Sequence, residues 1–355
     1  MKASAHMSFV VLIFLAGALL TGSTVIGSPA RVLQARYVWE HHAVNPYQVL
    51  RDVWGSSPTD VFVAGDDGTI IRCDGKACRP QVSGTFENLY AVWGASPTDV
   101  YAVGNRGTIV HFDRGHWQSV APSIASGCDF RAVWGSSPSD VYVAGAEGAM
   151  TAIEGGSVMP SAGVIFHYDG TRWLRQQTMA PITTVTAVWG RSRRDVYAGT
   201  AAGAVLHSDG STWGLVAQAP VGIWGPLLDV QALWATSPKD LYVAGTYSYE
   251  RTAEGDGNSG TKVTVGVLLH YGGKEWRPEL EGLEGQPGPG PVWINSAEDV
   301  YAVGPGATLL HFDGSDWEVC AAPLPTPLHR IWVAPTGEVV EIGPLGVILW
   351  GHRRE

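Results

Sequence analysis

A segment of about forty residues recurs along this chain, and the repeat restricts the available folds more than any other feature. The phrase AVWGASPTDVYAVG begins at Ala91, and close versions of it begin at Val53 and Ala132. One tryptophan anchors each copy: Trp54, Trp93, Trp134, Trp189, Trp234, Trp293 and Trp332. Successive anchors are 39, 41, 55, 45, 59 and 39 residues apart. Repeats of roughly 20–50 residues indicate solenoids, propellers or arrays.

Each copy contains four short runs rich in Val, Ile and Tyr, separated by Gly, Pro, Ser and Asp. In the second copy the last two runs are GTIVHFD and a segment that starts at Trp117. Four strands and three tight turns fill about forty residues and leave no room for a helix. The pattern therefore predicts an all-β fold made of four-stranded antiparallel blades, which is a β-propeller.

The seventh copy ends after its third strand, in GVILWGHRRE, and so lacks an outer strand. A matching tryptophan, Trp39, lies near the start of the chain, ahead of the first copy. We expect residues 37–43 to supply the missing strand, because joining the two chain ends closes the ring and protects the end repeats. The prediction is a single domain of seven blades.

The N-terminus has the pattern of an export signal. Lys2 precedes an apolar run of twelve residues, from Phe9 to Leu20. A membrane helix needs about 20 apolar residues, whereas this run fits the apolar part of a signal peptide. Ser28 and Ala30 place small residues around a cleavage site. We expect residues 1–30 to be a signal peptide and residues 31–355 to be one exported propeller domain, with an uncleaved N-terminal anchor as the alternative.

The charge of the chain excludes several classes of partner. The formal net charge is −10, and it becomes −11 when residues 1–30 are removed, because they contain Lys2 and no acid. Nucleic acids and anionic lipids favour clustered Lys and Arg, so neither is an expected partner. No later stretch approaches the length of a membrane span. We expect a soluble monomer.

Two cysteines of the first copy replace an aromatic pair that other copies carry across their last hairpin. Cys73 and Cys78 stand where the second copy has Phe112 and Trp117. An oxidising compartment allows such a cross-strand pair to form a bond. The sequence therefore predicts a Cys73–Cys78 disulfide, with two free thiols as the alternative. We predict no pairing for the remaining cysteines, Cys128 and Cys320.

An acid recurs at the start of the second strand of each copy: Asp60, Asp99, Asp140, Asp195, Asp240, Asp299 and Glu338. A histidine recurs on the third strand: His111, His167, His207, His270 and His311. We interpret the acids as hydrogen-bond acceptors for nearby backbone rather than as a cation ring. The histidines lie about 10 Å outside the first strands and diverge, so they do not converge on one metal ion. No metal and no cofactor are predicted.

No catalytic motif stands out, because the chain contains no G-x-S-x-G, H-E-x-x-H or Walker sequence. Glycine pairs such as Gly65 and Gly68 are expected in hairpin turns and not in phosphate cradles, since no helix follows them. A glycosidase would need two carboxylates about 5–10 Å apart, and the sequence singles out no such pair.

One face of the predicted propeller is richer in loops than the other. The connections between second and third strands, and those between blades, share a face that carries both long insertions, at residues 146–162 and 246–265. Variable loops on a rigid scaffold commonly carry function. Polar residues that enter the first strands near the axis on this face form the predicted ligand site: Arg51, Tyr90, Arg131, Gln231 and His329. The alternative is a water-filled channel mouth.

The repeat WGSSP-x-DVYAVG, followed by GTIVHFD and a tryptophan, resembles that of exported propeller proteins common in myxobacteria. Its DGTRW turn, from Asp169 to Trp173, is distantly similar to turns of the Asp-box (BNR) and Ycf48-like propellers. The turn departs from the Asp-box pattern by one residue, so the resemblance does not imply sialidase activity. The resemblance covers residues 37–355 and implies the fold, because propellers host many functions.

Three functional hypotheses follow from the sequence, the third being a purely structural envelope protein. The favoured hypothesis is a non-enzymatic exported binding or scaffold module that engages a protein or glycan through the loop-rich face. The alternative is a carbohydrate-active enzyme, similar to a glycosidase, that uses acids on the same face.

Overall fold

The structure is a computed structural model. It describes residues 37–44, 47–148, 162–220, 228–252, 260–281, 292–304, 308–321, 328 and 330–353. The predicted signal peptide, residues 1–30, lies outside the described residues, and so does His329 of the predicted ligand site.

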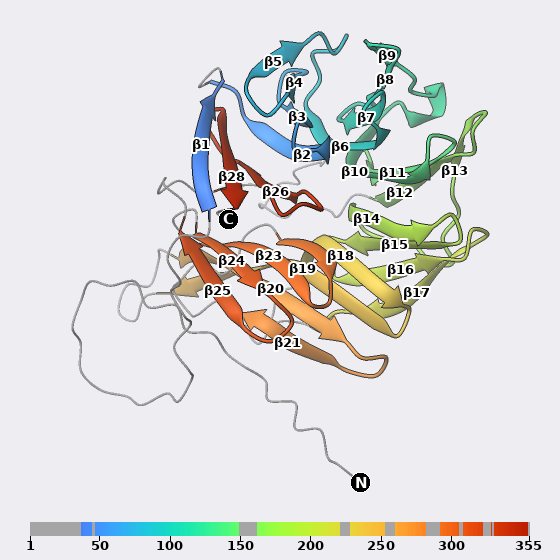
Figure 1. The fold of residues 1–355 in the computed structure, drawn as a ribbon. Coiled ribbons are helices and arrows are strands. Elements are labelled where there is room, and N and C mark those ends of the chain that lie inside the picture. The colour runs from blue at the N-terminus through green and yellow to red at the C-terminus, as the bar shows by residue number, and fades with distance from the viewer. Residues whose placement is uncertain are drawn as a thin grey trace.

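The described residues form seven four-stranded antiparallel sheets around a common centre, which confirms the predicted seven-bladed propeller (Figure 1). From the axis outward, the strands of a blade are called a, b, c and d. Blade one comprises β2 (Leu50–Ser57), β3 (Asp60–Gly65), β4 (Ile70–Cys73) and β5 (Cys78–Gln81). Blade two comprises β6 (Leu89–Ser96), β7 (Asp99–Gly104), β8 (Ile109–Asp113) and β9 (His116–Ser119). Blade three comprises β10 (Cys128–Ser137), β11 (Asp140–Glu147), β12 (Ala162–Tyr168) and β13 (Trp173–Arg175).

The remaining blades repeat this arrangement. Blade four comprises β14 (Val185–Ser192), β15 (Asp195–Thr200), β16 (Ala204–Ser208) and β17 (Trp213–Gln218). Blade five comprises β18 (Asp229–Ser237), β19 (Asp240–Thr252), β20 (Gly260–Tyr271) and β21 (Trp276–Glu281). Blade six comprises β22 (Val292–Ser296), β23 (Asp299–Gly304), β24 (Thr308–Phe312) and β25 (Trp317–Ala321). Blade seven comprises β26 (Arg330–Val333), β27 (Val339–Ile342), β28 (Val347–Arg353) and β1 (Tyr37–Ala43).

The N-terminal strand β1 is the outer strand of blade seven. It pairs with β28 in antiparallel register, from Tyr37 opposite Arg353 to Ala43 opposite Val347. The first and last strands of the chain are therefore neighbours, as the blue and red arrows of Figure 1 show. This confirms the predicted closure of the ring by residues 37–43.

Anchor tryptophans pack each blade against the next. The residue after the anchor is glycine in several copies, and a Cβ on Gly94 would lie only 2.5 Å from Cη2 of Trp54 in the preceding blade. The same contact crosses the closure, where a Cβ on Gly55 would lie 2.8 Å from Trp332. In the Trp-Gly dipeptide of the repeat, the tryptophan packs on the next blade, and the glycine leaves room for the tryptophan of the preceding blade. Clusters of buried apolar residues fill the rest of the space between blades.

The recurrent acid and histidine meet inside blades two to six. In blade three, His167 Nε2 lies 2.6 Å from Asp140 Oδ1, and its ring stacks on Tyr142 with centroids 4.2 Å apart. Ser136 donates to the other oxygen of Asp140. Although burial pushes the pKa of the Asp140 carboxyl upward, the hydrogen bonds from His167 and Ser136 hold this pKa below its ordinary value. The same pair recurs as Asp99–His111, Asp195–His207, Asp240–His270 and Asp299–His311.

Blade one uses different residues in the same geometry. Arg72 replaces the histidine, with Nε 2.6 Å from Asp60 Oδ1 and the guanidinium 4.8 Å from the centre of the Phe62 ring. In blades one to six the acid therefore joins the start of strand b to strand c through a His or Arg side chain, and not through nearby backbone as the sequence suggested. In blade seven Glu338 accepts a hydrogen bond from Thr336 instead.

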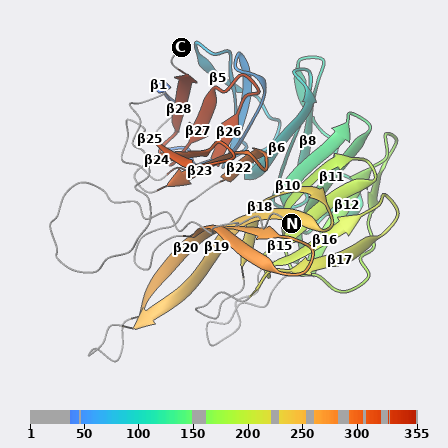
Figure 2. The ribbon, with the colours of Figure 1, turned by 60° about the horizontal axis from the view of Figure 1, so that its bottom comes forward.

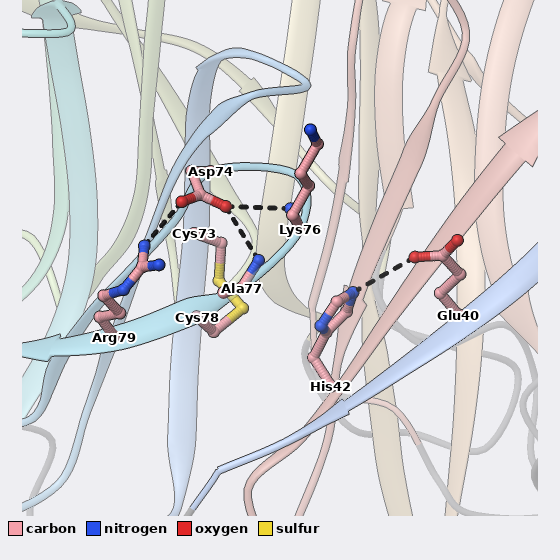
Figure 3. Close-up of a disulfide and its surroundings, with 8 residues drawn as sticks. All are labelled: Glu40, His42, Cys73, Asp74, Lys76, Ala77, Cys78 and Arg79. Carbon is pink, nitrogen blue, oxygen red and sulfur yellow. Dashed lines mark hydrogen bonds and ion pairs between the residues drawn. A yellow bond between two sulfur atoms is a disulfide. The ribbon is translucent and has the colours of Figure 1, made fainter.

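The predicted disulfide is present. Cys73 on β4 and Cys78 on β5 lie directly opposite each other and are bonded (Figure 3). The turn between them is held by Asp74, whose carboxylate accepts bonds from the Lys76 and Ala77 amides and from Arg79. The other two cysteines, Cys128 and Cys320, are buried and form no disulfide.

The b–c turns and the connections from strand d to the next strand a lie together and form what we call the loop-rich face. The blade-five insertion continues strands b and c of its blade, with Thr246 opposite Gly266 and Thr252 opposite Gly260. The resulting β19–β20 hairpin projects from the ring (Figure 2). Much of the blade-five insertion is therefore a regular hairpin and not an irregular loop. In the blade-three insertion, residues 149–161 lie outside the described residues.

Candidate ligand-binding site

A cavity of about 230 Å³ lies on the axis of the propeller, between the a strands of all seven blades. Its aromatic lining comes from the anchor residues Trp54, Trp93, Trp134, Trp189 and Trp293. Its polar lining comes from Asp52, Arg131, Thr186, Gln231 and Arg330. The cavity thus combines apolar walls with a few polar groups, which is the usual composition of a small-ligand site.

An ion pair in this lining joins the first and last blades. Arg330 Nε lies 3.5 Å from Asp52 Oδ1, and the Val92 amide donates to Asp52 Oδ2 over 2.9 Å. Burial raises the pKa of the Asp52 carboxyl above its ordinary value, and Arg330 and the amide offset part of that rise. Asp52, which lines the cavity, is therefore held by residues of blades two and seven.

Two arginines contact one tyrosine ring beside the cavity. The guanidinium carbon of Arg131 lies 4.0 Å from the centre of the Tyr90 ring, and that of Arg51 lies 5.6 Å from it. Arg51 also donates through Nε and Nη2 to the two oxygens of Asp66, both over 2.8 Å. This hydrogen bonding raises the pKa of Arg51. Arg131 forms no hydrogen bond or ion pair with any residue in the described part of the chain.

Polar groups of blades four and five complete the site. Gln231 Nε2 donates to Thr246 Oγ1 over 3.3 Å, and Thr186 donates to the carbonyl of Val230. Asp229 lies nearby, and its buried Oδ1 accepts no hydrogen bond from the described residues. Burial raises the pKa of Asp229, an effect that the charges of Arg330 and Arg131 partly offset.

The structure brings some of the predicted ligand residues together and separates others. Arg131 and Gln231 line the axial cavity. Tyr90 contacts Arg131 without lining the cavity, and Arg51 is engaged by Asp66.

The prediction missed three polar residues of the lining: Thr186, Asp52 and Arg330. A signal for each was present in the sequence. Thr186 holds the repeat position of Arg131, three residues before an anchor. Asp52 and Arg330 are charged where four other copies have alanine.

Exposed apolar side chains gather on the loop-rich face. Eight large hydrophobic residues are exposed among those that the structure describes, and six of them lie on b–c turns or d–a connections. Met179 lies between blades three and four, and the other five lie on loops from blade seven to the start of blade three. We call these five the apolar rim: Tyr47, Val82, Phe86, Ile124 and Leu345.

Hydrogen bonds connect the loops that carry the rim. The Gly346 amide donates to the backbone carbonyl of Gln48, and this bond links the turn of Leu345 to the loop of Tyr47. The Gly68 amide donates to the backbone carbonyl of Glu87, and this bond links the b–c turn of blade one to the loop of Phe86. The rim therefore runs along adjoining loops of blades seven, one, two and three. Arg131 lines the cavity from the same face.

The recurrent Ser, Asp and His residues do not form a hydrolase triad. Ser136 donates to Asp140 and not to His167, so the imidazole is not placed to remove a proton from the hydroxyl. Within the described residues, no group of three or more His, Cys, Asp or Glu side chains has the arrangement of a metal site. These residues also contain one short 3₁₀ helix, Ser123–Ala125, and no helix of the length and hydropathy that a membrane span requires.

Comparisons with known proteins relate the chain to other propellers by fold. No protein-family model matches it, and no curated protein matches it either. Among solved structures it is similar to Ycf48 bound to a D1 peptide, with a TM-score of 0.62 and 13% identity over 92% of this chain and 100% of that one. It is similar to a streptogramin B lyase, with a TM-score of 0.65 and 8% identity over 91% of this chain and 100% of that one.

A third similar structure is the extracellular domain of a hybrid two-component system from B. thetaiotaomicron, with a TM-score of 0.61 and 12% identity. The match covers 89% of this chain and 39% of that one. At these identities the similarity shows the propeller fold alone, and one fold hosts both binding proteins and enzymes.

Proposed function

We propose that this chain is a non-enzymatic binding or scaffold propeller that acts outside the cytoplasm and engages a protein partner through its loop-rich face. The apolar rim is the observation that carries the proposal. Phe86 is 92% exposed and Val82 is 90% exposed on one loop, and exposed apolar patches commonly mark interaction sites. A protein partner fits the rim better than a glycan does, because the aliphatic side chains of Val82, Ile124 and Leu345 offer a sugar no hydrogen bonds.

Export is part of the proposal. A disulfide joins Cys73 and Cys78, and disulfides persist in oxidising compartments. The predicted signal peptide at residues 1–30 and the extracellular location of a similar propeller support the same assignment. We also propose that the domain formed by residues 31–355 acts as a monomer.

The test compares partner capture by three forms of residues 31–355, using envelope extract from cells that produce the protein. The rim form carries Val82→Ser and Phe86→Ser. The control form carries Leu215→Ser, which changes a 62% exposed leucine on the outer strand β17. We expect the rim form to retain less than about a tenth of the captured protein, because truncation of a binding hot spot costs about 2 kcal/mol or more. The control form should match wild type.

Equal capture by all three forms would show that the rim is not the docking surface. A glycan array with the same forms separates the two ligand classes, since glycan binding that survives in the rim form would favour a sugar ligand.

The alternative, a carbohydrate-active enzyme, draws on one observation. Asp52 and Asp229 lie near the axis, and burial raises the pKa of both carboxyl groups. A glycosidase uses a carboxyl group of raised pKa as its general acid. Asp229 fits that role better, because Asp52 is bound to Arg330 and to the Val92 amide. Hydrolysis of aryl glycosides by the intact domain would favour the enzyme over the binding module.

A further inference from the structure

Two copies of the repeat place an arginine at the same position, but one copy lacks its acidic partner. Arg51 follows Leu50, and Arg131 follows Phe130, each three residues before an anchor tryptophan. Leu50 pairs with Gly65 and Phe130 pairs with Gly145, so the residues after these glycines are equivalent. They are Asp66 in blade one and Ala146 in blade three.

This difference decides what each guanidinium can bind. Asp66 occupies Nε and Nη2 of Arg51 through two hydrogen bonds of 2.8 Å. The Ala146 side chain offers no acceptor to Arg131, whose guanidinium carbon lies 4.0 Å from the centre of the Tyr90 ring and whose N–H groups donate to no described residue. In blade one, the equivalent arginine binds a carboxylate. We therefore expect Arg131 in blade three to suit a carboxylate as well.

The other charges around the cavity are already compensated. Arg330 lies 3.5 Å from Asp52, and the Val92 amide binds the second oxygen of that carboxylate. Asp229 is not among the lining residues; it is half-buried, and this burial raises the pKa of its carboxyl group. Arg131 acts on Asp229 only through its charge, and it is the charged group of the cavity lining for which the described residues provide no hydrogen bond or ion pair.

We propose that Arg131 binds the carboxylate of a ligand whose apolar body enters the axial cavity. A guanidinium presents parallel N–H donors that match the two oxygens of a carboxylate. The tryptophan walls beside it suit an aromatic or aliphatic body, and the cavity of about 230 Å³ admits a small one. The ligand is a free organic acid or the carboxylate of a docked protein. The inference rests on the proposed function in that it uses the same face, and it names the chemistry that this face recognises.

The experiment titrates residues 31–355 with benzoate and, separately, with benzamide, which has the same ring but no charge. Binding is followed by the fluorescence of the cavity tryptophans and by the Nε–H signals of arginine in NMR spectra. We expect benzoate to shift the Arg131 signal and benzamide to leave it in place. Benzoate should bind Arg131→Gln at least about tenfold more weakly, since a hydrogen bond to a charged group is lost.

Two further variants exchange the partners of the two blades. Ala146→Asp supplies blade three with the acid of blade one, and it should abolish benzoate binding while Arg131 remains. Asp66→Ala removes the acid from blade one, and it should produce a second benzoate-dependent signal, from Arg51. The second variant removes a side chain and gains a signal, so it stays informative if Ala146→Asp fails to fold.

The inference fails if benzoate and benzamide shift the same signals equally, or if Arg131→Gln binds benzoate as tightly as wild type. The form with Val82→Ser and Phe86→Ser separates this result from the proposed function, because it should titrate like wild type. Loss of benzoate binding in that form would mean that the rim variant has disturbed the fold. Partner capture without benzoate binding would retain the docking surface and reject the carboxylate site.

Discussion

At the scale of single residues, Glu341 on β27 departs from the repeat. Six other blades carry valine or alanine at its position: Val63, Ala102, Val143, Ala198, Val243 and Ala302. The Glu341 side chain is 0% exposed, and neither carboxyl oxygen bonds to a described residue. Burial raises its pKa to about 8, so the carboxyl is mainly neutral at pH 7.

This burial makes the stability of the fold depend on pH. The pKa of Glu341 is about 8 in the folded chain and near 4.5 in the unfolded chain, so the folded state binds the additional proton between these values. The free energy of unfolding therefore keeps its full contribution from the neutral Glu341 side chain below about pH 4.5. This contribution declines as the pH rises toward 8. In the wild type, the free energy of unfolding should fall by on the order of 4 kcal/mol across this pH range, and Glu341→Gln should remove this fall. Urea unfolding at several pH values measures both.

The control for this experiment is Glu338→Gln, three residues earlier on a partly exposed side chain. It should keep the pH dependence of the wild type. A wild-type stability that does not fall between pH 5 and 8 would contradict the neutral, buried state of Glu341.

At the scale of elements, the short-range features of each blade follow from the sequence. Tandem spacing predicts strands b, c and d, and the five-residue separation of Cys73 and Cys78 predicts their pairing, because a tight turn places such residues opposite each other. The SSPTD segment, residues 56–60, forms a tight turn between strands a and b. Ser57 pairs with Asp60, so the hairpin loop is only Pro58 and Thr59.

The contact between an anchor tryptophan and the next blade gives an element-scale prediction. Gly94→Ala places a Cβ about 2.5 Å from the Trp54 ring, so one blade must move relative to the other. We expect a loss of about 1–3 kcal/mol of stability in urea unfolding. Gly272→Ala is the matched control, because its Cβ would meet nothing within 4 Å, and it should change stability by less than about 0.5 kcal/mol. A similar loss in both variants would argue against the interblade contact as the cause.

At the scale of the whole molecule, three contacts join the first and last parts of the chain. β1 pairs with β28 along seven residue pairs, and Arg330 lies 3.5 Å from Asp52 across the boundary between blades seven and one. The anchor Trp332 also packs on Gly55 at this boundary. The ring is thus closed by backbone pairing, an ion pair and an aromatic contact.

A chain that begins at Val44 lacks β1 and tests the closure. It should expose the edge of β28, unfold at a lower urea concentration, and associate as its concentration rises, because an open strand edge pairs with other chains. Urea unfolding and light scattering after size-exclusion chromatography measure both effects. The reference is a chain that begins at Arg31. A Val44 chain that stays monomeric and equally stable would mean that β1 contributes little to closure.

The sequence by itself determined the blade count, the strand order, the closing strand and the disulfide. These features depend on tandem spacing and on residues that a short turn brings together, so they can be derived along the chain. Tertiary structure decided which arginine keeps an open N–H edge, how Asp52 finds Arg330, and where exposed apolar side chains gather. These depend on how separate blades meet around an axis, and side chains that are distant in the chain become neighbours only after the ring has closed.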